Sequence, residues 1–395
     1  MDAPTRSQGL IVAGFGVGQI VAFASSFYLM GVLGDAIARD LVLSSTLVFS
    51  MVSLSLAVPA FIAPTVARRM DEHGGRGTLL MSHVTFAIGL ALLGIAPNAA
   101  GLAAGMLAIG LGMAYGLSPT PFAILVSLYG EAARRPITGV ALIGGLGSTL
   151  GWPLTGWFAD EFGWRGACFL WAGVQLAFCL PLSAWVCPKT PGHVAHPGAH
   201  ADHPPVRWDR PMVQLAILFA CAWFISTCMS AHLPRLLGAF GLSPHAAAAA
   251  AGLMGVAAVT VRFLEFTMFR RLPPLATTRV ATLMHPAGAA ALVTFGGAGG
   301  SAMAIAQGAG NGMLTVAKGV LPLSLYGPAH YAYRSAVLGR PALFAQIFGP
   351  AVFALALERS ATLAVVGSSA LCLVMFAMTF GLRRHSSPFQ QQVIA

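Results

Sequence analysis

Charged side chains are rare in the long apolar stretches of this sequence, and the few present limit the chemistry that the protein can perform. Arg262 lies in one such stretch, and Glu265 follows three residues later, on nearly the same face of a helix. A planar guanidinium can hold a carboxylate through two parallel hydrogen bonds, so Arg262 indicates a site for an organic anion. Glu265 is the only carboxylate in these stretches, and it can either exchange a proton or neutralise Arg262.

A second group of polar side chains lies in other apolar stretches. Lys318 is the second cation at depth, and Asn311 and Gln307 precede it by about two and three helical turns. Ionisable groups are costly inside a membrane, so such residues indicate function. A simpler interpretation stays open, because long side chains can reach the inner surface and neutral ones can join helices. The predicted substrate-binding residues are Arg262, His232, Asn311, Gln307, Lys318 and Tyr115, and the predicted proton-coupling residues are Glu265 and His232.

Cys228, Met229 and His232 suggest a metal, as do the linker histidines His193, His196, His200 and His203, whose spacing among prolines and glycines favours a flexible linker instead. Cys228 and His232 are four residues apart on one helix face, and thiolate, thioether and imidazole ligands suit copper. The chain has 16 methionines and 6 cysteines, so chance proximity is the stronger explanation. No metal site and no cofactor are therefore predicted, and copper binding is kept as an alternative.

The composition places these residues in a bilayer. The chain of 395 residues is 57% hydrophobic and 9% charged, and its mean hydropathy is +0.77. A soluble protein carries roughly 25% charged residues, and a span needs about 20 apolar residues. The predicted fold is therefore all-α, with twelve membrane-spanning helices. The predicted spans are 9–33, 41–66, 78–96, 99–126, 136–159, 166–186, 211–232, 245–269, 280–295, 300–325, 341–357 and 361–382.

The positive charges predict the orientation of these spans. Of the 22 lysines and arginines, 16 fall on one side of the predicted spans and 4 on the other, with Arg262 and Lys318 inside spans. Because cytoplasmic loops carry the excess of positive charge, both termini are predicted to be cytoplasmic. The net charge of +10 follows from this topology, so it does not indicate a nucleic-acid partner.

One hydrophilic segment divides the chain into two similar parts. Residues 1–187 form the predicted N-terminal six-helix half, 188–210 a cytoplasmic linker, and 211–395 the C-terminal six-helix half. Arg135-Pro136 opens the fifth span, and Arg340-Pro341 opens the eleventh, 205 residues later. Such a parallel repeat places the substrate near the midplane, between the halves.

The loop after the second span carries the most specific motif, Ala67-Arg-Arg-Met-Asp71-Glu-His-Gly74-Gly-Arg76. It resembles the signature loop G-x-x-x-D-R-x-G-R-R of the major facilitator superfamily. Asp71, Gly74 and Arg76 fit that pattern, whereas Ala67 replaces its first glycine and Glu72 replaces the basic residue after the acid. The resemblance implies that the loop steadies one conformation of a transport cycle. The predicted gating residues are Asp71, Gly74, Arg76 and Arg68.

A second resemblance covers about forty residues of the seventh and eighth spans. The run from Ser230 through Ser243, followed by the alanine-rich stretch that ends at Arg262, is similar to the monocarboxylate-porter and oxalate/formate-type branch of the superfamily. In that branch the arginine binds the substrate carboxylate. Ala258 stands where the animal transporters have an aspartate, four residues before the arginine, so the resemblance carries over the arginine but not that acid.

These observations predict a secondary transporter, with a proton-coupled, monocarboxylate-like organic anion as its cargo. No G-x-x-x-x-G-K-[ST] loop is present, so ATP is not expected to drive it, and no enzyme activity is predicted. One alternative is efflux of hydrophobic or cationic compounds, because residues 147–156 resemble the glycine- and proline-rich motif of antiporters. Copper uptake is the other. The expected partners are a small solute, protons and lipid, and a monomer in a cell inner membrane is expected.

Overall fold

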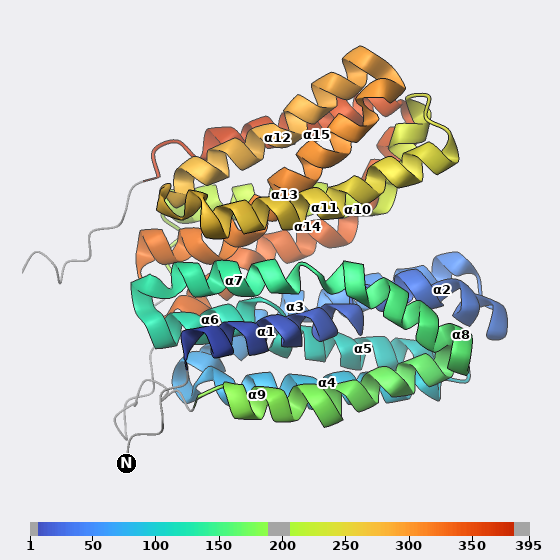
Figure 1. The fold of residues 1–395 in the computed structure, drawn as a ribbon, viewed down its shortest axis with the longest axis vertical. Helices are drawn as coiled ribbons and strands as arrows, with labels where there is room; N and C mark the ends of the chain where they lie inside the picture. The colour runs from blue at the N-terminus through green and yellow to red at the C-terminus, as the bar shows by residue number, and fades with distance from the viewer. Residues whose placement is uncertain (1–6, 189–205, 383–395) are drawn as a thin grey trace, which may run out of the picture.

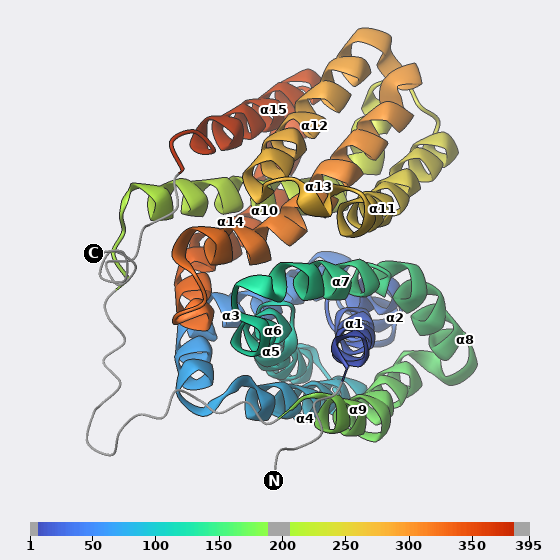
Figure 2. The same ribbon diagram turned by 60° about the vertical axis from the view of Figure 1, so that its left-hand side comes forward.

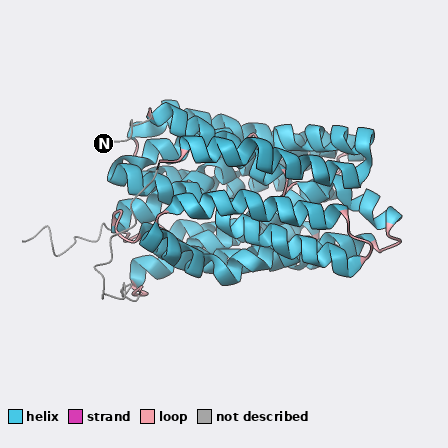
Figure 3. Ribbon diagram, turned by 90° about the horizontal axis from the view of Figure 1, so that it is seen from below, coloured by secondary structure: helices cyan, strands magenta, loops and turns pink. Residues whose placement is uncertain are grey.

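Every regular element in the described part of the chain is a helix. The computed structural model describes residues 7–188 and 206–382. The helices lie roughly side by side along one direction, as expected when each crosses the same apolar layer (Figure 3). This arrangement confirms the all-α fold that the hydropathy predicts.

The helices form two bundles, which are called here the N half and the C half. In Figure 1 the N half lies below and the C half above, and Figure 2 shows the same two bundles after a turn of 60°. The N half contains α1 (Gln8–Ala24), α2 (Leu29–Asp40), α3 (Ser45–His73), α4 (Gly75–Gly94), α5 (Ala99–Gly116), α6 (Pro119–Tyr129), η1 (Gly130–Ala133), α7 (Arg134–Gly144), α8 (Gly147–Val174), η2 (Gln175–Cys179) and α9 (Leu180–Val186). The C half contains α10 (Arg210–Ala239), α11 (Pro244–Thr267), η3 (Phe269–Arg271), α12 (Pro274–Phe295), η4 (Gly296–Gly299), α13 (Gly300–Tyr326), α14 (Tyr331–Arg359) and α15 (Ala361–Met378).

Several helical stretches fold back on themselves and cross the membrane more than once. The stretch Ala99–Val186 reverses at η1 and again at Gly163, where φ is +68°. The stretch Pro274–Tyr326 reverses at η4. Counted as separate passes, the apolar stretches of the described residues make up the twelve spans that the hydropathy predicts. The structure begins the eleventh span earlier than predicted, because α14 starts at Tyr331.

The two halves meet through equivalent helices. The Arg135 guanidinium, at the start of α7, lies 5.4 Å from the ring centre of Phe266 on α11. Its counterpart Arg340 donates from Nε to the carbonyl of Ala60 on α3, at 3.2 Å. Each arginine therefore reaches from its own half into the other one. This pairing agrees with the 205-residue repeat of the sequence. The proposed division at residues 187 and 210 stays a prediction, because most of the linker lies outside the described residues.

Three spans of the N half that were expected to be continuous are broken near their middles. The first span breaks between α1 and α2, the fourth between α5 and α6, and the fifth between α7 and α8. The Ser25 and Ser26 hydroxyls donate to the carbonyls of Val21 and Ala22 at the first break. The seventh span, α10, has no such break, so the two halves differ where the repeat would make them alike.

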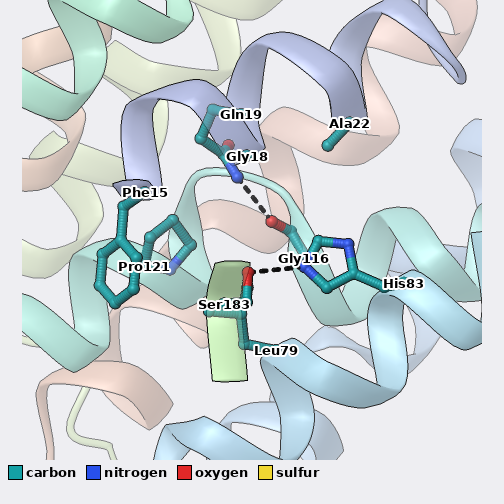
Figure 4. A pocket seen from close by; sticks show the side chains of 9 residues that line it. All are labelled: Phe15, Gly18, Gln19, Ala22, Leu79, His83, Gly116, Pro121 and Ser183. Carbon is teal, nitrogen blue, oxygen red and sulfur yellow. Dashed lines mark hydrogen bonds between the residues drawn. The ribbon is translucent and has the colours of Figure 1, made fainter. Parts of the chain in front are cut away.

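A polar side chain from another helix partners the backbone at the break in the fourth span. Gln19 of α1 donates from Nε2 to the carbonyl of Gly116, at 2.8 Å, and its Oε1 accepts from the Ser118 hydroxyl. A helix end inside a membrane leaves carbonyls without partners unless a side chain supplies one. Gln19 therefore supports the break between α5 and α6, close to a small cavity of the N half (Figure 4).

Candidate functional site

Arg262 lies buried where the two halves meet. Its side chain is 8% exposed, and its guanidinium donates to the Gly312 carbonyl at 3.4 Å and to the Thr315 hydroxyl at 3.2 Å, both on α13. Its Nη1 packs against Gly145 of the N half. Arg262 forms no ion pair in the described part of the chain. A buried guanidinium without a carboxylate is an arrangement that an anionic ligand would complete.

Tyr28 approaches the same place from the break in the first span. It lies close enough to Arg262 for the two groups to interact electrostatically. A β-carbon built on Gly147 would be 3.5 Å from Cε2 of the Tyr28 ring. The breaks in the first and fifth spans therefore face each other beside Arg262. Broken helices near the midplane are the common construction of substrate sites in transporters.

Glu265 lies one turn further along α11 and faces a different set of neighbours. Thr277 of α12 and Arg134 of α7 lie near its carboxyl group. Glu265 is 5% exposed, and its Oε2 accepts no hydrogen bond from the described residues. It therefore does not neutralise Arg262 by a direct ion pair in this structure. Because Glu265 lies between the halves, a movement of one half relative to the other would expose its carboxyl group to water.

Lys318 lies on the same side of α13 as Thr315, one turn away. Its Nζ is 3.9 Å from the centre of the Trp223 ring on α10, which is a cation–π contact. Like Arg262, Lys318 forms no ion pair in the part of the chain that the structure describes. The structure thus places two uncompensated cations on adjacent helices of the C half.

The two amides predicted on α13 are placed inside the C half. Gln307 is 4% exposed, and its Oε1 lies 2.6 Å from Nδ1 of His285 on α12. Asn311 borders a small cavity of the C half, which His285 and Gln307 also line. Its backbone carbonyl accepts a hydrogen bond from the Thr315 hydroxyl. Gln307 therefore connects helices of one bundle, and Asn311 lines a cavity inside the same bundle. Both stay predictions as substrate contacts.

His232 and Tyr115 lie away from Arg262. The His232 ring stacks on Phe353 of α14, with ring centres 6.0 Å apart, near the outer end of α10. From their positions along α10 and α11, Arg262 is roughly 15 Å deeper than His232. Tyr115, near the end of α5, packs against a buried apolar cluster to which both halves contribute. The structure does not bring either residue beside Arg262, and their roles stay predictions.

The copper alternative receives little support from the geometry. Cys228 and Met229 are fully buried in the core of the C half, and Cys228 faces Gly349 of α14. Within residues 7–188 and 206–382, no three His, Cys, Asp or Glu side chains are grouped as a metal would require. The pairing of Cys228 with His232 along one helix face is therefore explained by packing against α14.

The loop with the superfamily motif joins the two halves at their inner ends. The Asp71 carboxylate accepts from the backbone N–H of Tyr333, at 3.0 Å, and Arg68 donates to the Tyr333 hydroxyl, at 3.1 Å. Gly74 ends α3 with φ +83°, a conformation that favours glycine. Arg76 instead stays within the N half, where it donates to the carbonyls of Ala184 and Cys187. Asp71 and Arg68 therefore form the contact between halves that is called here the inner latch.

Several residues of the site were missed from the sequence. Tyr28 and Thr315 are ordinary polar residues in apolar stretches, and Gly145 is one of 46 glycines. The buried histidines His83 and His285 carried a usable signal, because they lie 202 residues apart in equivalent spans of the two halves. The 205-residue offset of Arg135 and Arg340 places His83 opposite Gly288, three residues from His285.

Comparison with known protein families gives one match over most of the chain. The family described as Major Facilitator Superfamily matches residues 15–306. Among curated proteins, Monocarboxylate transporter 14 of Mus musculus is 28% identical over 135 residues, 32% of this chain and 25% of that protein. Monocarboxylate transporter 13 of Bos taurus is 31% identical over 127 residues, 31% of this chain and 29% of that protein.

A third curated relative has a different cargo in its name. Multidrug resistance protein Stp of Mycobacterium tuberculosis (strain CDC 1551 / Oshkosh) is 29% identical over 167 residues, 42% of this chain and 31% of that protein. The chain thus aligns with less than a third of the length of each of these relatives.

Solved structures agree with the fold over nearly the whole chain. A variant of the E. coli fucose:proton symporter FucP superposes with a TM-score of 0.74 at 14% identity, over 97% of this chain and 100% of that one. The human organic anion transporter MFSD10 gives 0.72 at 17% identity, over 95% and 100%. At these identities the likeness shows the shared fold of twelve-helix transporters.

Proposed function

The chain belongs to the major facilitator superfamily of multi-pass membrane transporters, and on that premise we propose that it carries a small, monocarboxylate-like organic anion together with protons. Arg262 anchors the carboxylate of the cargo. Cargo would enter between the halves and would be released when they rock about the central site. The transporter acts as a monomer in a cell inner membrane.

The observation that carries this proposal is the set of groups that surrounds the Arg262 guanidinium. Its guanidinium is buried beside Gly145 with only two long hydrogen bonds and no ion pair among the described residues. An unpaired buried charge is costly, and a carboxylate that accepts two hydrogen bonds from it removes much of that cost. Lys318 adds a second unpaired cation on the neighbouring helix, which favours an anion over a cation as cargo.

The curated relatives support the same cargo class. Two of the three are named monocarboxylate transporters, and their alignments reach 28% and 31% identity. The relation is partial, because Ala258 stands where those animal transporters would be expected to carry an acid. We therefore assign the carboxylate anchor to Arg262 and look for the proton-carrying group elsewhere.

Glu265 is the proposed proton-carrying group. It is buried between the halves, and its Oε2 accepts no hydrogen bond from the described residues, so this oxygen is free to hold a proton. Arg134 and Arg262 lie near enough to act on its charge. His232, the other predicted proton-coupling residue, lies toward the outer end of α10, where it would act only at the entrance.

The inner latch indicates which state of the cycle this structure represents. Asp71 and Arg68 hold the start of α14, and Gly319 of α13 packs tightly against Phe122 and Ile137 of the N half. These contacts close the inner side. We infer that this is the outward-facing state and that the latch must open for release.

The decisive experiment measures binding of monocarboxylates, from formate to benzoate, to the purified protein in detergent. Arg262→Gln is expected to abolish ligand-induced stabilisation. Arg262→Lys is expected to weaken ligand affinity by about tenfold, because lysine keeps the positive charge but lacks the planar guanidinium that donates two parallel hydrogen bonds. Arg279→Gln is the matched control, since the Arg279 guanidinium donates to the hydroxyl and the carbonyl of Thr379 within the C half. Equal stabilisation of the wild type and Arg262→Gln would exclude Arg262 as the anchor.

Efflux of a hydrophobic or cationic compound is the second candidate. It rests on the similarity to Multidrug resistance protein Stp and on the glycine- and proline-rich stretch of residues 147–156. A lipophilic cation such as tetraphenylphosphonium separates the two proposals. Stabilisation by this cation, unchanged in Arg262→Gln, would favour efflux over anion transport.

A further inference from the structure

A chain of four buried polar side chains crosses the N half and ends at the break in the first span. Ser183 of α9 lies 2.8 Å from Nε2 of His83 on α4, and Nδ1 of His83 lies 2.7 Å from Oε1 of Gln175 (Figure 4 shows the first contact). Gln175 donates from Nε2 to the Ser25 hydroxyl, at 2.8 Å. At most 4% of each of these four residues is exposed.

Hydrogen-bond chemistry fixes the direction of this chain. The amide oxygen of Gln175 only accepts, so Nδ1 of His83 carries the proton and Nε2 accepts from the Ser183 hydroxyl. The Ser25 hydroxyl donates its own proton to the Val21 carbonyl, at 2.7 Å. Every member therefore donates once toward the first span, an arrangement in which successive bonds strengthen one another.

One turn of π-helix makes the chain possible. Gln175 and Ser183 are eight residues apart, and in an α-helix they would point about 80° apart around the axis. η2 contains an i→i+5 bond, from the Leu180 N–H to the Gln175 carbonyl, and this turn absorbs one extra residue. The difference falls to about 20°, so both side chains reach the same imidazole. The π turn is thus explained by the need to hold His83 at both nitrogens.

The far end of the chain lies next to the Arg262 site. Ser25 begins the break between α1 and α2, and the Tyr28 N–H closes it with an i→i−5 bond to the Phe23 carbonyl, at 3.0 Å. Three residues beyond Ser25, the Tyr28 ring lies beside Gly147, and Gly147 is two residues from the Gly145 backbone against which Arg262 packs. The position of Tyr28 therefore depends on how firmly the break is held.

The C half contains the same kind of histidine without this connection. His285 lies 2.6 Å from Gln307 and 2.9 Å from the Ser368 hydroxyl, on α13 and α15. Among the described residues neither Gln307 nor Ser368 is hydrogen-bonded to α10, whereas Gln175 is bonded to Ser25, and α10 is an unbroken helix. The two histidines are buried to a similar degree, at 2% and 3% exposed. Because only His83 is linked to a broken span, a comparison of the two histidines tests that link.

We propose that His83 is a positioning residue: through Gln175 and Ser25 it fixes the break in the first span, and thereby holds Tyr28 beside Gly147, at the break in the fifth span that Arg262 enters. The effect on ligand affinity rests on the proposed anion function, whereas the effect on the break does not. His83 itself lies in the interior of the N half and makes no contact with the central site.

The test compares variants that keep different nitrogens of the ring. His83→Asn places an amide N–H near the position of Nδ1 and keeps donation to Gln175, whereas His83→Gln reaches toward Ser183 and loses Gln175. Hydrogen–deuterium exchange of the peptide that covers residues 22–30 reports on the break directly. His83→Gln is expected to raise exchange at residues 25–29 by about tenfold, and His83→Asn by less than about threefold. His285→Gln is the matched control and should leave this peptide unchanged.

Benzoate binding forms the second arm of the experiment. Its Kd should rise about tenfold in His83→Gln and in Ser25→Ala, which cuts the chain at its other end, and should stay near the wild-type value in His83→Asn. Unchanged exchange in both His83→Gln and Ser25→Ala would overturn the proposal, as would equal effects of His83→Gln and His285→Gln on residues 25–29. If the wild type binds no benzoate, the anion function fails, and the exchange comparison still decides the role of His83.

Discussion

The guanidinium of Arg262 fills the space where a β-carbon of residue 145 would be, because Gly145 has none. Arg262 belongs to α11 of the C half, and Gly145 lies in the break between α7 and α8 of the N half. The glycine thus lets a charged side chain from one half enter the backbone break of the other. This contact couples the position of the anion anchor to the relative position of the two halves.

Gly145→Ala is expected to displace Arg262 without removing its charge. The added methyl group overlaps Nη1, so the guanidinium must move away from the break and from Tyr28. Affinity for a monocarboxylate should fall by about tenfold, as a misplaced bidentate donor loses one of its two hydrogen bonds. Titration calorimetry with benzoate measures the change. Gly156→Ala is the control, because a β-carbon there meets nothing within 4 Å, and equal losses in both variants would contradict the steric explanation.

Glu265→Gln is expected to separate binding from proton coupling. The amide keeps the size of the side chain but cannot take up or release a proton, so a pH gradient should no longer drive accumulation of the anion. Exchange of labelled anion across proteoliposomes needs no net proton movement, and it should continue at a rate within about threefold of wild type. Accumulation that still follows the pH gradient in Glu265→Gln would assign the coupling to another group.

Arg68→Ala should weaken the inner latch. It removes the hydrogen bond to the Tyr333 hydroxyl and leaves the Asp71 contact with the Tyr333 N–H in place. A partly exposed bond of this kind is worth about 1 kcal/mol, so the inward-open population should rise about fivefold. The readout is maleimide labelling of an Ile137→Cys variant without other cysteines, because Ile137 is buried against Gly319 on the closed inner side.

The neighbouring Arg69→Ala variant serves as the control for the latch. Arg69 is exposed on the same turn of α3 and makes no hydrogen bond or ion pair in the described residues. The Arg69→Ala variant changes the charge of the loop by the same amount as Arg68→Ala. If both variants raise labelling of Ile137→Cys equally, loop charge rather than the contact with Tyr333 controls the inner side.

The outer end of the N half should show a pH-dependent stability. Arg165 donates a hydrogen bond to Asp40 and thereby holds the pKa of that carboxyl below its ordinary value of 3.8, with smaller help from its charge and from Trp164. Because the pKa is depressed in the folded state, the contribution is complete above the ordinary value and is lost as the pH falls below it. The melting temperature of the wild type should therefore drop below about pH 4, and Asp40→Asn should lack this part of the drop. Parallel curves for the two proteins would show that the pair adds no measurable stability.

Much of this protein is determined by its sequence alone. Long apolar stretches predict the twelve spans, because the cost of exposing a polar backbone to lipid leaves a helix as the only solution. Arginine placement predicts the orientation, and the recurrence of Arg135-Pro136 as Arg340-Pro341 predicts the paired halves. Arg262 could be singled out from the sequence, since a charged side chain in an apolar stretch is costly and therefore indicates a function.

The tertiary structure alone decided what surrounds Arg262. Ser25 and Gln175 are 150 residues apart, and nothing in the local pattern of either one shows that they meet. Hydropathy reports the free energy of transferring each helix into lipid, and this free energy depends on the residues of that helix alone. Helix breaks depend on partners that satisfy the freed backbone groups, and those partners come from other helices. For this reason the sequence singled out Arg262, while only the fold showed that its guanidinium packs against Gly145 of the other half and that hydrogen bonds link His83 to the break at Ser25.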